Sequence, residues 1–199
     1  MIYVAIGASD VVGEGADYPE NEGWVAVLHA KLPKGATLHR LGVSGSTAED
    51  AIHEQIPRAE AAGPGLVTIW LVVNDFRTEV PLSDYRLHLD EIVSRMTATG
   101  ATVLVGNMPE LTSMPEFSST PPDELRTLMA TWNSAIEEVV TSRGAVLVDL
   151  LAASEEMEGD TSMLLSEDGF HPSTLGHLAL AEIFHHYYEL VSSQTAERQ

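Results

Sequence analysis

Serine, histidine and aspartate, three residue types that together carry out nucleophilic catalysis, lie near opposite ends of this sequence. Ser9 follows an apolar run at 2–6, and Asp168 and His171 lie three residues apart in a segment broken by glycine and proline, which predicts a shared loop. An aspartate that accepts from a histidine ring N–H fixes the tautomer and leaves the other ring nitrogen as a base. These three are candidate catalytic residues, although taken singly they also fit a capping serine and a surface loop.

Two further segments offer the hydrogen-bond donors that a developing oxyanion needs. Gly45 lies in a turn at 42–47, where free backbone N–H groups suit an anion. Asn74 follows another apolar run, and its amide can donate to the same oxygen. An ordinary capped helix start and an Asn-Asp turn explain these two segments almost as well.

The candidates follow predicted strands. Short apolar runs that suit strands buried on both faces occur at 2–6, 37–41, 66–73, 101–105 and 145–148. Apolar residues with helical spacing occur at 24–32, 82–96, 125–139 and 173–191. Alternating strands and helices pair in parallel, and ligands bind beyond the carboxyl ends of such strands. The pattern predicts an α/β fold, a three-layer α/β/α sandwich around a mostly parallel sheet of about five strands.

Composition limits the organisation of the chain and its chemistry. The 199 residues, 44% of them hydrophobic, fit one domain at 1–191 with a flexible tail at 192–199. The absence of cysteine excludes disulfides, thiolate metal sites and a cysteine nucleophile. The histidines outside the candidate set show no metal-ligand spacing with carboxylates, so we expect neither metal nor other cofactor.

The charge and the first residues bear on partners and location. A formal net charge of -20 repels phosphate backbones, so nucleic acid is not an expected partner. The opening residues have neither the basic segment of a signal peptide nor the length of a membrane span. We expect a cytoplasmic location, with a trimmed secreted form left open, and the oligomeric state stays undetermined.

Taken in order, the motifs resemble those of the SGNH hydrolases, also called the GDSL esterase/lipase family. Ser9, Gly45 and Asn74 match its first three blocks, and Asp168 with His171 match its closing Asp-x-x-His, so the resemblance spans residues 7–173. It implies the flavodoxin-like SGNH hydrolase fold. It also implies a nucleophilic Ser9, a base at His171, an orienting carboxylate at Asp168, and an oxyanion hole from the Ser9 N–H, the Gly45 N–H and the Asn74 side chain.

Two departures from the family pattern leave alternatives open. Ala8 replaces the aspartate of Gly-Asp-Ser, and Val72 replaces the glycine of Gly-x-Asn-Asp. The expected activity is a serine esterase that hydrolyses small carboxylic esters through an acyl-serine. A carbohydrate O-acetyl esterase of the same fold and a non-catalytic relative that binds small molecules are the alternatives. Asp149, after the last strand, is a minor candidate for the carboxylate partner of His171.

Overall fold

The structure, a computed structural model, describes residues 1–156 and 161–197 and is built on one parallel sheet. Its strands are β1 (Ile2–Gly7), β2 (Thr37–Arg40), β3 (Leu66–Trp70), β4 (Thr102–Gly106) and β5 (Val146–Val148). They lie in the order β2-β1-β3-β4-β5, and each neighbouring pair is parallel. This arrangement confirms the sheet predicted from the apolar runs.

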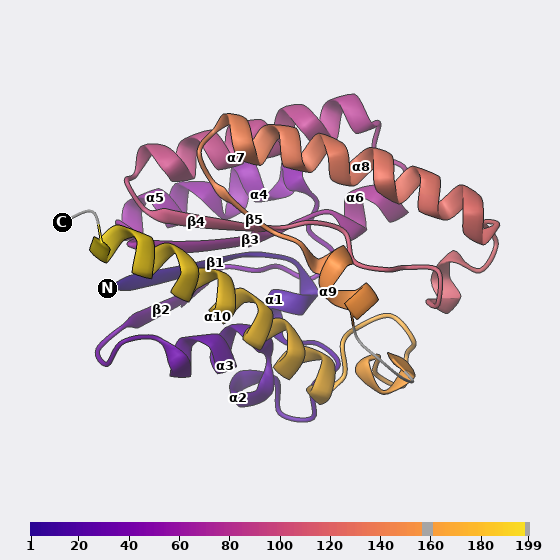
Figure 1. Cartoon of the computed structure of the whole chain (residues 1–199), viewed down its shortest axis with the longest axis horizontal. Coiled ribbons are helices and arrows are strands. Elements are labelled where there is room, and N and C mark those ends of the chain that lie inside the picture. Colours follow the sequence, from indigo (N-terminus) through magenta and orange to yellow (C-terminus); the bar gives the residue numbers. More distant parts are fainter. Residues whose placement is uncertain (157–160, 198–199) are drawn as a thin grey trace.

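Helices cover both faces of the sheet, which gives the predicted three layers (Figure 1). One face carries α4 (Ala48–Glu54), α5 (Ile56–Ala62), α7 (Leu82–Ala98) and α8 (Pro122–Ser142). The other carries α2 (Pro19–Glu22), α3 (Trp24–Lys31) and α10 (Thr174–Glu197). The shorter elements are α1 (Ser9–Val12), α6 (Val73–Arg77), α9 (Leu150–Glu156) and the 3-10 turns η1 (Pro115–Phe117) and η2 (Thr161–Leu164).

The apolar strands hold these layers together. Every residue of β3 is buried, as are the last five of β1, because helices shield the central strands from water on both sides. Aromatic pairs join neighbouring helices on each face. Trp24 of α3 stacks on Phe184 of α10 at 4.5 Å between ring centroids, and Tyr85 of α7 meets Trp132 of α8 at 4.8 Å.

Two element boundaries differ from the sequence prediction. The third apolar run leaves the sheet at Trp70, and Val73 begins α6 instead of ending a strand. The last helix continues to Glu197, so residues 192–197 of the expected tail are helical, while 198–199 lie outside the described residues. In the part of the chain that the structure describes, no helix is long and apolar enough to cross a membrane.

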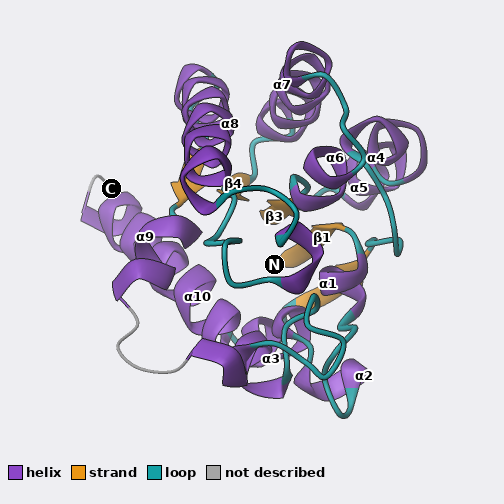
Figure 2. Cartoon of the chain, turned by 90° about the vertical axis from the view of Figure 1, so that its right-hand side faces the viewer, coloured by secondary structure: helices purple, strands orange, loops and turns teal. Residues whose placement is uncertain are grey.

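The strand order fixes where a ligand can bind. The chain moves from β1 outward to β2 and then returns to the opposite side of β1 for β3, so the crossovers diverge between β1 and β3. A crevice opens at such a switch point, beyond the carboxyl ends of the strands. Figure 2 looks toward this end of the sheet, where α1, α6, α9 and several loops meet.

Candidate active site

A hydrogen-bonded chain of three side chains lies at the switch point. Ser9 is the first residue of α1, directly beyond β1, and its Oγ lies 3.0 Å from Nε2 of His171. The other ring nitrogen of His171, Nδ1, lies 2.6 Å from Oδ2 of Asp168. The structure therefore brings together all three candidate catalytic residues, although Ser9 and His171 are 162 positions apart in the sequence.

Asp168 and His171 lie on one loop, which is held by its own hydrogen bonds. Oδ1 of Asp168 accepts from the Ser166 hydroxyl at 2.8 Å and from the backbone N–H groups of Phe170 and His171 at 2.8 and 2.9 Å. Burial raises the pKa of Asp168, but the hydrogen bonds from His171, Phe170 and Ser166 outweigh it and hold that pKa below its ordinary value. Asp168 is thus a carboxylate that can accept the Nδ1–H of His171.

The three predicted oxyanion donors come from three separate segments of the chain. As the first residue of α1, Ser9 has an N–H with no acceptor inside the helix. Gly45 adopts a φ of 80° in the turn after β2, a left-handed conformation that favours glycine, and it is exposed. Asn74 is 8% exposed and donates through Nδ2 to the Ser46 carbonyl at 3.1 Å. Ser46, rather than Gly45, lines the cavity beside Ser9 and Asn74.

Gln55, between α4 and α5, is a residue that the sequence analysis missed. This fully buried side chain accepts from the Gly7 N–H at 3.0 Å and donates to the Gly7 carbonyl at 2.9 Å. Its Nε2 also donates to the Ser46 hydroxyl at 3.1 Å. Since Gly7 precedes Ser9 by two residues and the Ser46 carbonyl accepts from Asn74, the hydrogen bonds of Gln55 connect the segments of Ser9, Ser46 and Asn74. No local pattern signals this role.

Asp75 is a second missed residue, which the sequence offered only as part of a turn. It is fully buried, and both carboxylate oxygens accept from the Ala48 N–H, at 3.2 and 3.0 Å. Burial raises the pKa of Asp75 to about 7, and the hydrogen bond from Ala48 opposes this shift. Asp75 thereby fastens α6, which carries Asn74, to the start of α4.

Asp10, next to Ser9, is a partly exposed residue whose carboxyl group is largely shielded from water. Its Oδ2 accepts from the indole N–H of Trp24 at 3.2 Å, and burial raises its pKa to about 7. The direction follows from the cost of keeping a charge away from water, which the hydrogen bond from Trp24 offsets only in part. A second titratable carboxyl group therefore lies beside Ser9.

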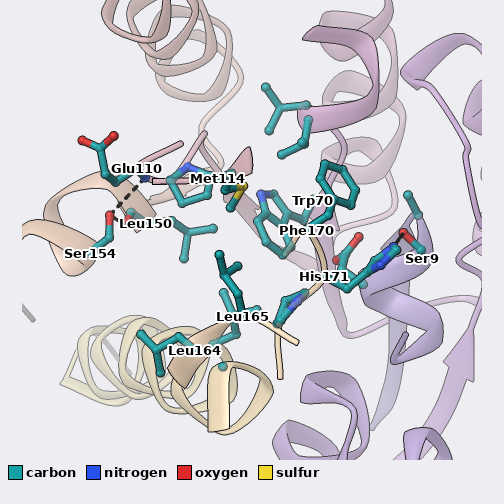
Figure 3. A pocket seen from close by; sticks show the side chains of 18 of the residues that line it. Ser9, Trp70, Glu110, Met114, Leu150, Ser154, Leu164, Leu165, Phe170 and His171 are labelled. Carbon is teal, nitrogen blue, oxygen red and sulfur yellow. Dashed lines mark hydrogen bonds between the residues drawn. The ribbon is translucent and has the colours of Figure 1, made fainter. Parts of the chain in front are cut away.

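A largely apolar cavity of about 190 Å³ opens beside Ser9 and His171 (Figure 3). Side chains from well-separated elements form its wall, including Trp70, Met114, Leu150, Leu165, Phe170 and Ile183. The connection at 107–122 has four large apolar residues, namely Met108, Leu111, Met114 and Phe117. Of these, Met114 lines the cavity and the other three are buried in the core.

Asp149 is engaged elsewhere, which argues against its role as the carboxylate partner of His171. Its Oδ1 accepts from the Asn107 side chain at 2.8 Å and from the Ala152 N–H at 3.0 Å, so it caps α9. Within residues 1–156 and 161–197, no group of three or more histidine, aspartate or glutamate side chains is placed to hold a metal ion.

These features place hydrogen-bonded serine, histidine and aspartate side chains at the switch point of a parallel sheet, and comparison with known proteins identifies the family. Residues 5–179 match the model of the GDSL-like lipase/acylhydrolase family, and the chain belongs to this family. A search of curated proteins gave no significant match.

Solved structures share the fold. One is the psychrotrophic esterase EstA from Pseudoalteromonas sp., with TM-score 0.76, 18% identity, and 96% of this chain and 98% of that chain covered. Another is the acetylxylan esterase Axe2 from Geobacillus stearothermophilus, with TM-score 0.76, 21% identity, and 94% and 93% covered. A third is the lipase/acylhydrolase from Enterococcus faecalis, with TM-score 0.75, 19% identity, and 94% of each chain covered. Family and fold together support an enzyme that hydrolyses esters.

Proposed function

We propose that this protein is a serine esterase that hydrolyses carboxylic esters through an acyl-enzyme on Ser9. The observation that carries the proposal is the hydrogen-bonded chain from Ser9 through His171 to Asp168. A serine hydroxyl is a weak nucleophile until an adjacent base accepts its proton, and a histidine oriented by a carboxylate is the usual base. The two hydrogen bonds provide this activation.

The two ring nitrogens of His171 have different roles in the proposed reaction. Ser9 Oγ attacks the carbonyl carbon of the ester while its proton passes to Nε2 of His171. The bond to the alcohol then breaks, and the alcohol leaves with the proton from Nε2, so the acyl group stays on Ser9. Water attacks this acyl-enzyme, gives a proton to Nε2, and the carboxylic acid departs as Ser9 Oγ recovers that proton. Asp168 holds the Nδ1–H throughout and stabilises the transient imidazolium.

The oxyanion formed in each half-reaction needs donors close to Ser9. We assign this role to the backbone N–H groups of Ser9 and Gly45 and to the side-chain amide of Asn74. The amide nitrogen of Asn74 has two hydrogens, and only one is needed for the Ser46 carbonyl, which leaves the other for the substrate. Removal of one donor from such a set costs about 3 to 4 kcal/mol of transition-state stabilisation.

The cavity beside Ser9 is suited to bind an apolar acyl group. Ala8 and Val72, the two departures from the family pattern, are both buried in its wall, so they replace an aspartate and a glycine with apolar surface. Burial of each methylene of an acyl chain against such a wall contributes about 0.8 kcal/mol. We therefore expect butanoate and longer esters to be hydrolysed with higher kcat/KM than acetate esters.

The proposal is tested with nitrophenyl butanoate and a fluorophosphonate probe. EstA is described as inhibited by monoethylphosphonate, so a phosphorus electrophile is a suitable probe for this fold. The wild-type protein should release nitrophenol and carry the probe on Ser9, whereas Ser9→Ala should lose roughly 10⁴-fold or more in kcat. Ser83→Ala, an exposed serine on α7, is the matched control. Equal turnover by wild type and Ser9→Ala would contradict the mechanism.

A carbohydrate O-acetyl esterase is the second candidate, supported by the structural similarity to an acetylxylan esterase. The chemistry at Ser9 is the same, and only the two ends of the substrate differ. Acetylated xylo-oligosaccharides compared with a series of nitrophenyl esters from acetate to octanoate separate the two candidates. A preference for acetate, with rates falling along the series, would favour the carbohydrate esterase.

A further inference from the structure

A carboxylate from a residue outside the cavity wall lies against His171, the proposed catalytic base. Oε2 of Glu14 lies 3.4 Å from Nε2 of His171, the nitrogen that also contacts Ser9. Oε1 of Glu14 accepts from the hydroxyl of Ser44, which directly precedes Gly45. Glu14 is not among the residues that line the cavity.

The backbone fixes Glu14 in this place. Its N–H donates to the Ser9 carbonyl at 3.0 Å, and its carbonyl accepts from Nε2 of the buried His177 at 2.8 Å. The next residue, Gly15, has a φ of 93°, and a Cβ there would lie 2.2 Å from the Pro172 carbonyl oxygen and 2.9 Å from Cβ of His171. The segment after α1 therefore packs directly against the histidine loop, and only glycine permits this approach.

The proposed reaction determines which part of the substrate meets Glu14. The alcohol oxygen must come within about 3 Å of Nε2 of His171 to receive its proton. Glu14 lies 3.4 Å from the same nitrogen, so the first atoms of the alcohol lie within roughly 6 Å of the carboxylate. The acyl chain, in contrast, occupies the apolar cavity, which Glu14 does not line.

Among the described residues, the carboxylate of Glu14 forms no ion pair with a lysine or an arginine. Among the described residues its one ion-pair contact is with His171, and its side chain is 41% exposed. Arg40 packs under the same segment, but its guanidinium donates to the Val12 carbonyl and pairs with Glu20 at 3.6 Å. A chain of net charge -20 adds a negative field around the site.

We propose that Glu14 selects the alcohol part of the ester, which rests on the proposed esterase function. Alcohols that carry a positive charge or several hydroxyl donors are accepted beside the carboxylate. Alcohols that carry a negative charge near the ester bond are rejected by repulsion from Glu14. The acyl group is thus chosen by apolar contact in the cavity and the leaving group by the charge of Glu14.

The test uses butanoate esters that differ only in the charge of the alcohol: choline butanoate, glycerol 1-butanoate and the butanoate ester of 2-hydroxyethanesulfonate. Acid release in a pH-stat gives kcat/KM for each. The wild type should favour the choline ester over the sulfonate ester by about tenfold or more, because charges about 6 Å apart near a protein surface interact on this scale. Glu14→Gln should lower that ratio by about tenfold, and added salt should lower it in the wild type.

The controls separate this inference from the esterase proposal. Glu137→Gln removes one exposed carboxylate from α8 and should leave the ratio unchanged. A Glu14→Gln variant with the wild-type ratio, or with an equal loss on all three esters, would overturn the inference. So would labelling of Ser9 by the fluorophosphonate without hydrolysis of choline butanoate. Absence of both labelling and any ester hydrolysis would instead overturn the proposed function.

Discussion

The two halves of the site are held in different ways. On the nucleophile side, Ser9 and Asn74 are each 8% exposed, and the fully buried side chains of Gln55 and Asp75 fasten their backbones to distant elements. On the base side, Asp168 is half-exposed, with 49% of its side chain accessible, and its hydrogen bonds join residues at most three positions apart.

The difference shows that the sheet positions Ser9, the proposed nucleophile, and a loop positions His171, the proposed base. A long-range buried network is rigid but costly to disturb, because any unpaired polar group there loses its hydrogen bonds without gaining water. A half-exposed loop held by local bonds tolerates substitution with little loss of stability. Substitutions on the base side should therefore affect rate alone, and those on the nucleophile side should affect both rate and stability.

Asp168→Asn should give the largest effect among these substitutions. The Oδ1 atom that accepts the loop N–H groups remains, but the amide no longer holds the Nδ1–H of His171, and the wrong tautomer is favoured. We expect kcat on nitrophenyl butanoate to fall roughly 10³- to 10⁴-fold. The free energy of unfolding in urea should change by about 0.5 kcal/mol or less. A loss below tenfold, or one no larger than that of the exposed neighbour Glu167→Gln, would contradict the assignment.

Asn74→Ala should reduce kcat by roughly 10²- to 10³-fold, because it removes a side-chain donor to the oxyanion. KM should change little, since the oxyanion exists only in the transition state and the intermediates. Unlike Asp168→Asn, this substitution also leaves the buried Ser46 carbonyl without its partner, so stability should fall by about 1 kcal/mol or more. Steady-state kinetics and urea unfolding measure both effects. A rise in KM with unchanged kcat would assign Asn74 to ground-state binding instead.

Gln55→Leu tests whether the buried network positions the nucleophile. The substitution removes the partner of the Gly7 N–H and one of the two donors to the Gly7 carbonyl, which keeps the Val43 N–H at 3.2 Å, so we expect a loss of roughly 1 to 3 kcal/mol in stability. A displaced Ser9 should lower kcat by about ten- to a hundredfold with a smaller change in KM. Thr68→Val is the matched control, since it breaks a buried hydrogen bond with Tyr3 elsewhere in the sheet. Equal losses of kcat in the two variants would reduce Gln55 to a purely structural role.

The same division explains what the sequence could predict. Asp168 and His171 were readable because their contact is made within four residues of chain, and Ser9 because it follows an apolar strand. The role of Gln55 was not predictable, because its partner Gly7 lies 48 positions away and no local pattern around Gln55 indicates the contact. Glu14 was not predictable either, because only the fold brings its carboxylate within 3.4 Å of His171.

The fold was predictable to the level of strands and helices, and its boundaries less so. Leu71 and Val72 stay buried after the chain leaves the sheet at Trp70, so hydrophobicity continues across the end of β3. Apolar runs of this length do not distinguish a strand from the start of a buried helix. Gly45 shows a similar limit. A glycine is compatible with the left-handed conformation found there, but the sequence does not indicate that Ser46, and not Gly45, lines the cavity.

Asp10→Asn should have the smallest effect on rate. Its effect on the pH dependence of stability tests whether the Ser9 side of the site is shielded from water. Burial raises the pKa of Asp10 to about 7, so in the folded protein the neutral acid is favoured. The stability that this carboxyl group contributes is fully present below its ordinary pKa near 4 and is lost as pH rises through 7. The asparagine keeps an oxygen acceptor for the Trp24 indole and carries no charge.

The free energy of unfolding of Asp10→Asn relative to wild type should therefore rise by about 2 kcal/mol between pH 5 and pH 8. Urea titrations at the two pH values measure it, and Asp17→Asn, an exposed aspartate in the same segment, is the control. A flat difference for Asp10→Asn would mean that water reaches this carboxylate. The nucleophile side would then be as solvated as the loop of Asp168, and the contrast between the two halves of the site would be lost.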